Sequence, residues 1–244
     1  MKLIRQIVFI TLLFHGIFAY SDQLIVGVLK FAPPFSSADV DNHFFGFSID
    51  LMNEICKRIN ATCTFKGTDL NSQFKDLNDG VIDITTLPSP ISSTESGDYI
   101  FSLPYMTSRG QFVVLKGSNI NSTEDIKDKK IGALQATSFQ YNILPNYTSQ
   151  KNIKTYSQVT ALIQAVSNRE VDAALLNEHV ARYLLLNKTI DGFQLIGNPI
   201  VTGNGYGIIA LKKNAPIIDK INKALLQIET DGTYLTLYNK YFGK

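Results

Sequence analysis

The hydrophobic positions of residues 24–65 follow the period of a strand, then that of a helix, then that of a strand again. Residues 24–29 form a short apolar run that stops before two consecutive prolines at 33 and 34. Four apolar residues then recur at every fourth position, on one face of a helix predicted to end near Asn60: Phe47, Leu51, Ile55 and Ile59. A strand resumes at residues 63–65. A helix between two short strands predicts a parallel pair, because parallel neighbours need a crossover connection.

The segment 30–44 is the first place where we expect function. It leaves the carboxyl end of the first predicted strand and is predicted to be a polar loop as far as His43. In α/β proteins the loops at the carboxyl ends of parallel strands line the ligand crevice.

The alternation of strand and helix patterns continues to the C-terminus. Apolar runs predict strands at 81–87, 111–115, 130–134, 171–176 and 206–211. Helices are predicted at 70–77, at 122–129 with Ser122 as N-cap, from Ser138 to about Pro145, after Ser157, after Asn177, over 217–228 and over 234–241. Strands that alternate with helices predict α/β layers.

Residues 1–21 have the pattern of a secretory signal peptide. Lys2 and Arg5 precede an apolar stretch at 7–14, and Ala19-Tyr20-Ser21 is a small-x-small cleavage site. The apolar stretch is too short to span a bilayer as a helix, so a membrane anchor or a buried strand is the weaker alternative. We predict an exported protein that is cleaved after Ser21.

Charge and composition narrow the class of partner. The chain has 244 residues, of which 45% are hydrophobic, enough for a packed core. Removal of residues 1–21 takes away two basic residues, which leaves 21 Lys and Arg against 21 Asp and Glu. A nearly neutral chain without a basic run argues against nucleic acid and anionic membrane surfaces as partners.

Cys56 and Cys63 are the two cysteines of the chain. They are seven residues apart across a predicted helix-to-strand turn, where they can reach bonding distance. Because an exported chain meets an oxidising compartment, we predict a disulfide. A redox pair or a metal site is the alternative, but the chain has no Cys-x-x-Cys motif and no neighbouring histidine ligands. We predict no metal and no cofactor.

The segment GFSIDLMNEICKRINATCTF, at 46–65, resembles the corresponding segment of the periplasmic histidine and lysine/arginine/ornithine-binding proteins. These belong to the type-3 solute-binding proteins of ABC importers. Further matches are FSLPY at 101–105, VDAA at 171–174, DGTY at 231–234 and YFG at 241–243. The resemblance implies a two-lobed α/β fold, the periplasmic-binding-protein type II fold, with two hinge strands and a ligand cleft between the lobes. It implies a first lobe of residues 22–108 and 204–244 and an inserted second lobe of residues 109–203.

The resemblance also implies ligand-binding positions. In such proteins an amino acid's carboxylate meets an arginine of the first lobe and the start of a helix in the second, and its ammonium meets an aspartate. Thr137 and Ser138 match the helix start, although both could be ordinary N-caps. Leu134 matches as apolar cover, and so does Leu70, for which a core role is equally consistent.

Other positions depart from the family pattern. The acidic position after the first strand is Leu29, the arginine expected near Thr94-Glu95 is missing, and Asn177 stands where the aspartate is expected. The aromatic lid falls on Ala32, with Phe31 beside it as a possible replacement. The serines after the strand at 81–87 fall on Leu87 and Pro88, which leaves Ser89 nearby.

These departures predict weak binding of an ordinary zwitterionic amino acid and argue against arginine, lysine or histidine as the ligand. A charge-assisted contact contributes roughly 1.5–3 kcal/mol, and an unpaired buried charge costs more. Arg109, in the first crossing, could supply a fork for a carboxylate, or it could be a solvated hinge residue. Asn177 suits a neutral amide, hydroxyl or carbonyl, or it caps the next helix.

We therefore interpret the chain as a periplasmic, monomeric solute-binding protein that captures a small polar solute, an amino acid or an amino-acid-like compound, for a membrane permease of an ABC importer. One alternative is a ligand-sensing module for a signalling partner. Another is a small-acid dehydratase on the same scaffold, for which Asp39, Asp69 and Glu178 could face the cleft. We predict no enzyme activity, because the mature chain has only His43 and His179 and no acid–base constellation.

Overall fold

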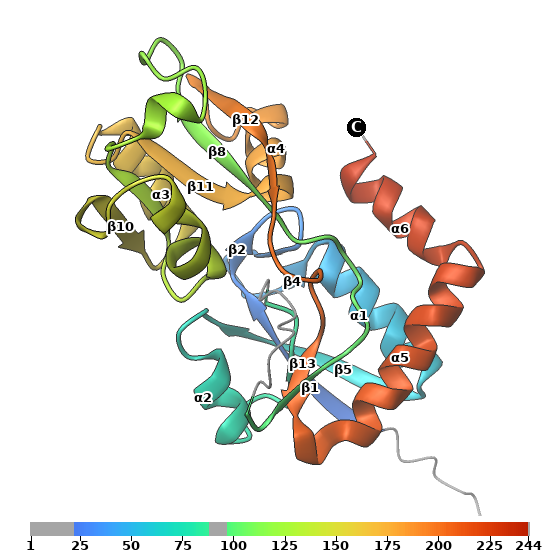
Figure 1. The fold of residues 1–244 in the computed structure, drawn as a ribbon. Helices are drawn as coiled ribbons and strands as arrows, with labels where there is room; N and C mark the ends of the chain where they lie inside the picture. The colour runs from blue at the N-terminus through green and yellow to red at the C-terminus, as the bar shows by residue number, and fades with distance from the viewer. Residues whose placement is uncertain (1–21, 88–96, 244) are drawn as a thin grey trace, which may run out of the picture.

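The computed structural model describes residues 22–87 and 97–243, and it has two lobes, each built on a mixed β-sheet (Figure 1). The predicted signal peptide and Ser89 lie outside the described residues. The lower lobe in Figure 1 contains both described chain ends, and the upper lobe contains the middle of the chain.

The sheet of the lower lobe has the strand order β5-β1-β6-β13-β7 in the described ranges. Its strands are β1 (Asp22–Leu29), β5 (Ala61–Thr68), β6 (Ile84–Thr85), β7 (Tyr99–Phe101) and β13 (Ile209–Leu211). β1 pairs in parallel with β5 along its whole length, from Asp22 opposite Ala61 to Leu29 opposite Thr68. This is the parallel pair that the strand–helix–strand pattern predicts. The helices of this lobe are α1 (Phe47–Arg58), α2 (Gln73–Asn78), α5 (Ala215–Thr230) and α6 (Thr233–Phe242).

The sheet of the upper lobe has the order β10-β9-β11-β8-β12. Its strands are β8 (Arg109–Leu115), β9 (Ile131–Leu134), β10 (Ile153–Tyr156), β11 (Ala173–Asn177) and β12 (Phe193–Val201). β9 runs parallel to β10 and β11, whereas β8 runs antiparallel to β11 and β12. The helices α3 (Val159–Ser167) and α4 (Glu178–Leu186) belong to this lobe. Sequence periodicity missed β10 and β12.

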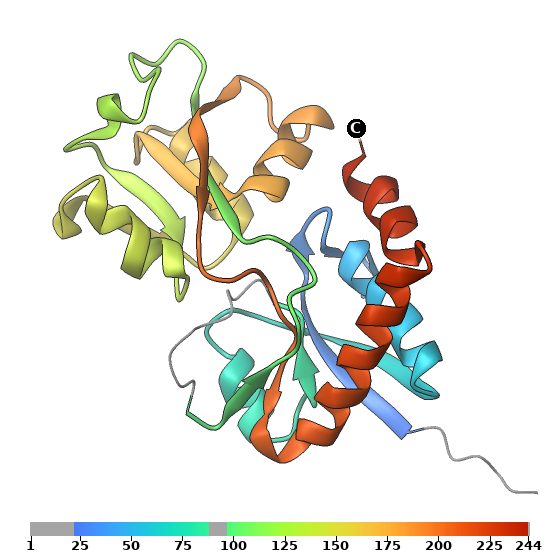
Figure 2. The same cartoon turned by 45° about the vertical axis from the view of Figure 1, so that its right-hand side comes forward.

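Two segments of the chain cross between the lobes, at residues 102–108 and 202–208, and they run side by side in Figures 1 and 2. Backbone hydrogen bonds join them, from Tyr105 N–H to Tyr206 C=O (2.9 Å) and from Thr202 N–H to Ser108 C=O (2.9 Å). The side-chain hydroxyls of Ser108 and Thr202 lie 2.6 Å apart. The two crossings therefore form one paired connection.

The segment 30–44 is more ordered than its polar composition predicts. It forms a small antiparallel sheet of β2 (Phe31–Ala32), β3 (Ser36–Ala38) and β4 (Phe44–Phe45). The C=O groups of Pro34 and Phe35 accept the N–H groups of Phe47 and Ser48 at the start of α1, each at 2.8 Å. These bonds satisfy donors that a helix N-terminus leaves without an internal partner.

Several predicted helices are shorter than the sequence pattern suggests. The helix expected at 122–129 is the 3₁₀ turn Glu124–Ile126, because Asp125 Oδ2 accepts the N–H groups of Asn121 and Ser122 and holds the preceding chain in a turn. α2 begins at Gln73, because Asp69 Oδ1 accepts the N–H groups of Asn71 and Ser72 in the same way. α3 has Gln158, and not Ser157, at its N-cap position.

Cys56 in α1 and Cys63 in β5 form the predicted disulfide, with their Cα atoms 5.9 Å apart. Replacing both cysteines by serine should lower the free energy of unfolding by about 2.5 kcal/mol, since the bridge limits the conformational entropy of the unfolded chain. Urea denaturation measures this loss. Reductant should destabilise the parent protein in the same direction and leave the double variant unchanged. An unaltered midpoint in the double variant would contradict the expectation.

The stability of the folded protein should depend on pH through Asp231, which lies between α5 and α6. Hydrogen bonds from Thr233, and then the Arg58 guanidinium 2.7 Å away, lower the pKa of Asp231 to about 2. A carboxyl whose pKa is lower in the folded state stabilises the protein above its unfolded pKa, near 4, and loses that contribution as the pH falls toward 2. Between pH 4 and pH 2 the melting temperature of Asp231→Asn should therefore fall less than that of the parent. Asp128→Asn is the control, because Asp128 is an exposed carboxyl at a left-handed position that asparagine also tolerates. Equal slopes for Asp231→Asn and the parent would refute the assignment.

Candidate functional site

The carboxyl ends of four strands, two from each sheet, meet in one interlobe cleft. Leu29 ends β1 and Thr68 ends β5 in the lower lobe, while Leu134 ends β9 and Asn177 ends β11 in the upper lobe. All four residues line one or both of two adjoining hollows. We call these the inner cavity, of about 30 Å³, and the outer groove, of about 380 Å³.

The inner cavity is lined mainly by apolar side chains from both lobes. Its lining residues are Leu29, Ala32, Leu70, Leu134, Thr137, Phe139, Val159, Leu175, Leu176, Asn177, Val180 and Tyr206. Leu175 and Tyr206 are almost fully buried, at 0% and 1% exposure. Among these described residues, none carries a formal charge near neutral pH.

The polar side chains of the inner cavity already have hydrogen-bond partners. Asn177 Nδ2 donates to the Tyr206 hydroxyl at 2.8 Å, and Asn177 Oδ1 accepts the Val180 N–H at 3.2 Å. The Thr137 hydroxyl donates to the C=O of Leu134 at 2.6 Å. Burial raises the pKa of Tyr206 and keeps its hydroxyl protonated. Asn177 is thus the N-cap of α4 and also a bridge from the upper lobe to the second crossing.

The outer groove carries the charges of the cleft. Lys30, Asp69 and Asp76 line it, together with Phe31, Ser72, Ser157 and Gln158. Lys30 Nζ donates to Asn42 Oδ1 at 3.2 Å, and the stem of Lys30 lies on Gly67, where a Cβ would come within 2.6 Å of Lys30 Cε. Asp76 Oδ2 accepts the hydroxyl of Thr68, and Asp69 caps the turn before α2. The charges therefore lie toward the opening, and the apolar surface lies inward.

Arg109 belongs to an ion pair within the upper lobe. Its Nε lies 2.8 Å from Glu178 Oε2. The two side chains form a close ion pair, but the N–H of Arg109 is not aligned with this oxygen as a hydrogen bond requires. Glu178 is buried, and its other oxygen accepts from Arg182 Nε at 2.9 Å. Arg109 is not among the residues that line the inner cavity or the outer groove.

Glu178→Ala should lower the free energy of unfolding by about 1–3 kcal/mol, because it removes the carboxylate that neutralises two arginines. Urea denaturation checks this effect. Glu124→Ala, at an exposed position of the same lobe, should change stability by no more than about 0.5 kcal/mol. A loss no larger in Glu178→Ala than in Glu124→Ala would show that the pair is not stabilising.

The structure places the other predicted site residues as follows. Leu70 and Leu134 line both hollows, Thr137 and Asn177 line the inner cavity, and Phe31, 40% exposed, lines the outer groove. Ser138 lies between two lining residues, Thr137 and Phe139.

No regular α-helix begins at Thr137 and Ser138, although the sequence predicted one there. The chain there forms a π-helix of five residues, Phe139–Ile143, followed by the 3₁₀ turn Leu144–Asn146, which contains Pro145. A proline inside a helix removes a backbone donor and ends the regular ladder. So short a helix is not an anion site by itself, and Ser138 makes no side-chain cap hydrogen bond.

Sequence reasoning missed several lining residues. Phe139, Leu175, Leu176 and Val180 look like ordinary core positions in the sequence, and their packing confirms that they are buried. Tyr206 could have been predicted as a cleft residue, since it stands between two glycines in a predicted crossing between the lobes. Of the acids that were candidates to face the cleft, Asp69 lines the outer groove, whereas Asp39 and Glu178 line neither hollow.

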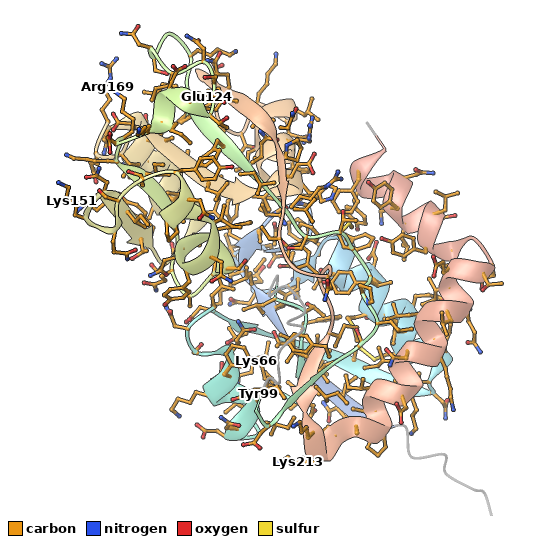
Figure 3. The ribbon with its side chains drawn as sticks, viewed as in Figure 1. Lys66, Tyr99, Glu124, Lys151, Arg169 and Lys213 are labelled. Carbon is orange, nitrogen blue, oxygen red and sulfur yellow. A yellow bond between two sulfur atoms is a disulfide. The ribbon has the colours of Figure 1, made fainter. Side chains whose placement is uncertain are left out.

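The two histidines of the described chain line neither the inner cavity nor the outer groove. His43 Nδ1 lies 3.0 Å from Asp39 Oδ2 in an exposed turn. His179 packs against the rings of Phe242 and Phe35, at centroid distances of 4.7 and 6.0 Å. Burial lowers the pKa of His179. Figure 3 shows Lys151, Arg169 and Lys213 at the outer edge of the lobes, and Lys66 and Glu124 are likewise exposed.

Two lobes joined by paired crossings, with a cleft at the carboxyl ends of their strands, define a binding protein of the two-lobed periplasmic type. The chain belongs to family 3 of the bacterial extracellular solute-binding proteins, whose model matches residues 24–244. None of the helices in the described part of the chain is both long and apolar enough to cross a membrane.

Proteins of known sequence and structure support this assignment. The chain is 29% identical over 238 residues to the arginine-binding periplasmic protein of Mannheimia haemolytica, covering 96% of this chain and 97% of that one. It is 30% identical over 232 residues to the histidine-binding periplasmic protein of Escherichia coli strain K12, covering 92% and 89%. A crystal structure of an arginine 3rd transport system periplasmic binding protein from Legionella pneumophila has 35% identity and a TM-score of 0.85, over 91% of this chain and all of that chain.

Proposed function

We propose that the protein captures an amino acid, or an amino-acid-like compound, outside the cytoplasm and delivers it to the membrane permease of an ABC importer. Family membership supports the binding role. Relatives named as arginine- and histidine-binding periplasmic proteins support the amino-acid class. The observation that carries the proposal is the interlobe cleft, because residues from both lobes line it at the carboxyl ends of their strands.

Ligand capture would use closure of the lobes. We propose lobes of residues 22–108 with 204–244, and 109–203, that rotate about the paired crossings at 102–108 and 202–208. Phe31, Leu70, Leu134, Thr137 and Asn177 would contact the ligand or cover it. Arg109, Ser138 and Ser89 stay candidates for contacts that form on closure.

The cellular setting follows from the same proposal. The chain would be exported by its N-terminal signal peptide, cleaved after Ser21, and would act as a periplasmic monomer. It would need no cofactor and would catalyse no reaction.

A sensing role would instead require a signalling partner, and a dehydratase would turn over small acids. Pull-down with the candidate permease and assays of turnover separate these alternatives.

A thermal-shift screen of amino acids, amides and small carboxylates tests the proposal directly. A ligand that binds the native state raises its melting temperature, by an amount set by the ratio of ligand concentration to Kd. At least one amino acid or close analogue should raise the melting temperature in a saturable way. A screen in which none does would refute the amino-acid class.

Thr137→Ala should reduce the ligand-induced shift, with a loss of affinity of about three- to tenfold. The hydroxyl holds the turn after β9 through its bond to Leu134 C=O, and both residues line the inner cavity. Titration calorimetry of the best ligand measures the change. Thr189→Ala is the matched control, since Thr189 is exposed at the end of α4. Equal affinities for the two variants would remove Thr137 from the site.

A further inference from the structure

The two lobes also meet where α4 of the upper lobe contacts the C-terminal end of α6 of the lower lobe (Figures 1 and 2). His179, in the first turn of α4, makes this contact and lines neither the inner cavity nor the outer groove. We propose that the imidazole of His179 is a proton-sensitive contact between the lobes: uncharged, it holds α4 against α6, and when it takes up a proton the two helices separate. Such a contact goes beyond the proposed function, since it acts without a ligand.

The imidazole packs among aromatic rings of the lower lobe. Its centroid lies 4.7 Å from that of Phe242 and 6.5 Å from that of Tyr238, both in α6, and 6.0 Å from that of Phe35 in the segment 30–44. The three rings also pack on one another, with Phe242 5.0 Å from Tyr238 and 5.5 Å from Phe35. A side chain of the upper lobe thus completes an aromatic cluster of the lower lobe.

This environment favours the uncharged imidazole. Nε2 of His179 is buried and has no hydrogen-bond partner among the described residues. A protonated ring would place a charged N–H donor there without an acceptor, and an unpaired buried charge costs more than an unpaired neutral group. Burial is accordingly the main reason that the pKa of His179 lies below its usual value. Separation of α4 from α6 would let water solvate the charge.

The charged side chains of the upper lobe oppose a further positive charge at this place. The Glu178 carboxylate favours protonation of His179, but it is shared between Arg109 of β8 and Arg182 of α4. Two guanidinium groups against one carboxylate leave an excess of positive charge, and both arginines lower the pKa of His179. Proton uptake would therefore increase repulsion within α4 as well as the cost of burial.

The lower lobe offers the charged ring little compensation. From α6, Lys240 and Tyr241 line a hollow that His179 also lines. The carboxylate of Asp50, in α1, accepts hydrogen bonds from both of them, each at 2.6 Å. The nearest charge that α6 presents at this hollow is thus the ammonium of Lys240, which has the same sign as a protonated histidine.

The same hollow gives protons access to the ring. It has a volume of about 270 Å³ and is bounded by Pro34, by the face of α4 from His179 to Asn187, and by residues 240–242 of α6. Pro34 and Phe35 carry no titratable group, so the segment 30–44 adds no charge at the contact. Since the ring of His179 is only partly buried, it can take up a proton while the protein stays folded.

The distance between two spin labels tests the proposal on the full mature protein. Labels at Leu186 of α4 and Asn239 of α6, both exposed, report the separation of the two helices. A change from pH 7.5 to pH 5 should lengthen this distance in the parent. His179→Phe should keep the shorter distance at both pH values, because a phenyl ring fills the same place and takes up no proton. His43→Gln is the control, since it removes the other histidine of the mature chain, and it should respond as the parent does.

The melting temperature gives a second reading of the same contact. A histidine whose pKa is lower in the folded state than its ordinary value, near 6.5, makes the stability fall as the pH drops below that value. Between pH 7.5 and pH 5 the parent should therefore lose more in melting temperature than His179→Phe. If His179→Phe does not fold, His179→Gln should show equal label distances at the two pH values. A parent distance that does not change with pH, or a response in His179→Phe as large as that of the parent, would overturn the proposal.

Discussion

Phe47→Ala should destabilise the protein by about 3–5 kcal/mol, the largest effect that we expect of a single substitution in the core. Phe47 is fully buried at the start of α1. Its ring contacts those of Phe35, Tyr105 and Phe242, at centroid distances of 6.3, 6.4 and 5.0 Å. Alanine would remove the ring and leave a cavity among these neighbours, and neither loss is recovered by partial collapse.

The loss should extend beyond α1. Helix α6 has no fully buried residue, and it is held by half-buried aromatic side chains that pack against Phe47 and its neighbours. Hydrogen exchange in α6 should therefore accelerate in Phe47→Ala, and urea denaturation should show the lower stability. Phe45→Ala is the matched control, since Phe45 is 57% exposed two residues earlier, and it should change stability by no more than about 0.5 kcal/mol. Similar losses in the two variants would contradict this account of the core.

Gly46→Ala should destabilise the protein by about 3–5 kcal/mol, although it adds only one methyl group. Gly46 has φ 128° and ψ 178°, a region that is open to glycine alone, and strain of this kind costs about 1–3 kcal/mol. A Cβ at this position would lie 2.5 Å from the carbonyl oxygen of Phe35 and 2.9 Å from that of Pro34. These oxygens accept the first N–H groups of α1, and each lost hydrogen bond costs about 1 kcal/mol more.

Gly117→Ala separates the cost of a strained backbone conformation from the cost of a steric overlap with neighbouring atoms. Gly117 also has a positive φ, 73°, but a Cβ there would meet nothing within 4 Å. Its replacement should cost about 1–2 kcal/mol, the ordinary penalty of a left-handed residue. Urea denaturation of both variants gives the comparison. Equal losses at the two glycines would show that the carbonyls of Pro34 and Phe35 move aside and do not fix the start of α1.

The sequence predicted those parts of the fold that depend on local pattern. Apolar residues at every fourth position specified α1, and the runs on either side of it specified the parallel pair of β1 and β5. Asn177 was predicted as a possible N-cap and caps α4. The disulfide followed from the separation of its cysteines and the predicted export. The helix, its cap and the disulfide involve residues that are close along the chain, so that sequence spacing determines their geometry. The strands of the parallel pair are 39 positions apart, and they were predictable because the helix between them is the crossover that a parallel pair requires.

Local pattern was insufficient where side chains or distant strands decide the structure. The polar segment 30–44 forms three short strands because its backbone pairs with itself and caps α1. Asp69 and Asp125 shorten two predicted helices by accepting backbone N–H groups, a competition that periodicity does not show. β12 pairs with β8 across most of the upper lobe, and this pairing is visible only once the chain has folded.

Local pattern in the sequence predicted the main helices and the disulfide of this protein, and the resemblance to a known family implied its two-lobed class. The tertiary structure alone decided which polar groups of the cleft already have partners. Asn177 and Tyr206 are 29 positions apart, yet their side chains are 2.8 Å apart in a buried hydrogen bond, and Arg109 pairs with Glu178 outside both hollows. The physical reason is that the charge available to a ligand depends on the other groups that a side chain contacts, and those contacts form only when the two sheets and their crossings come together.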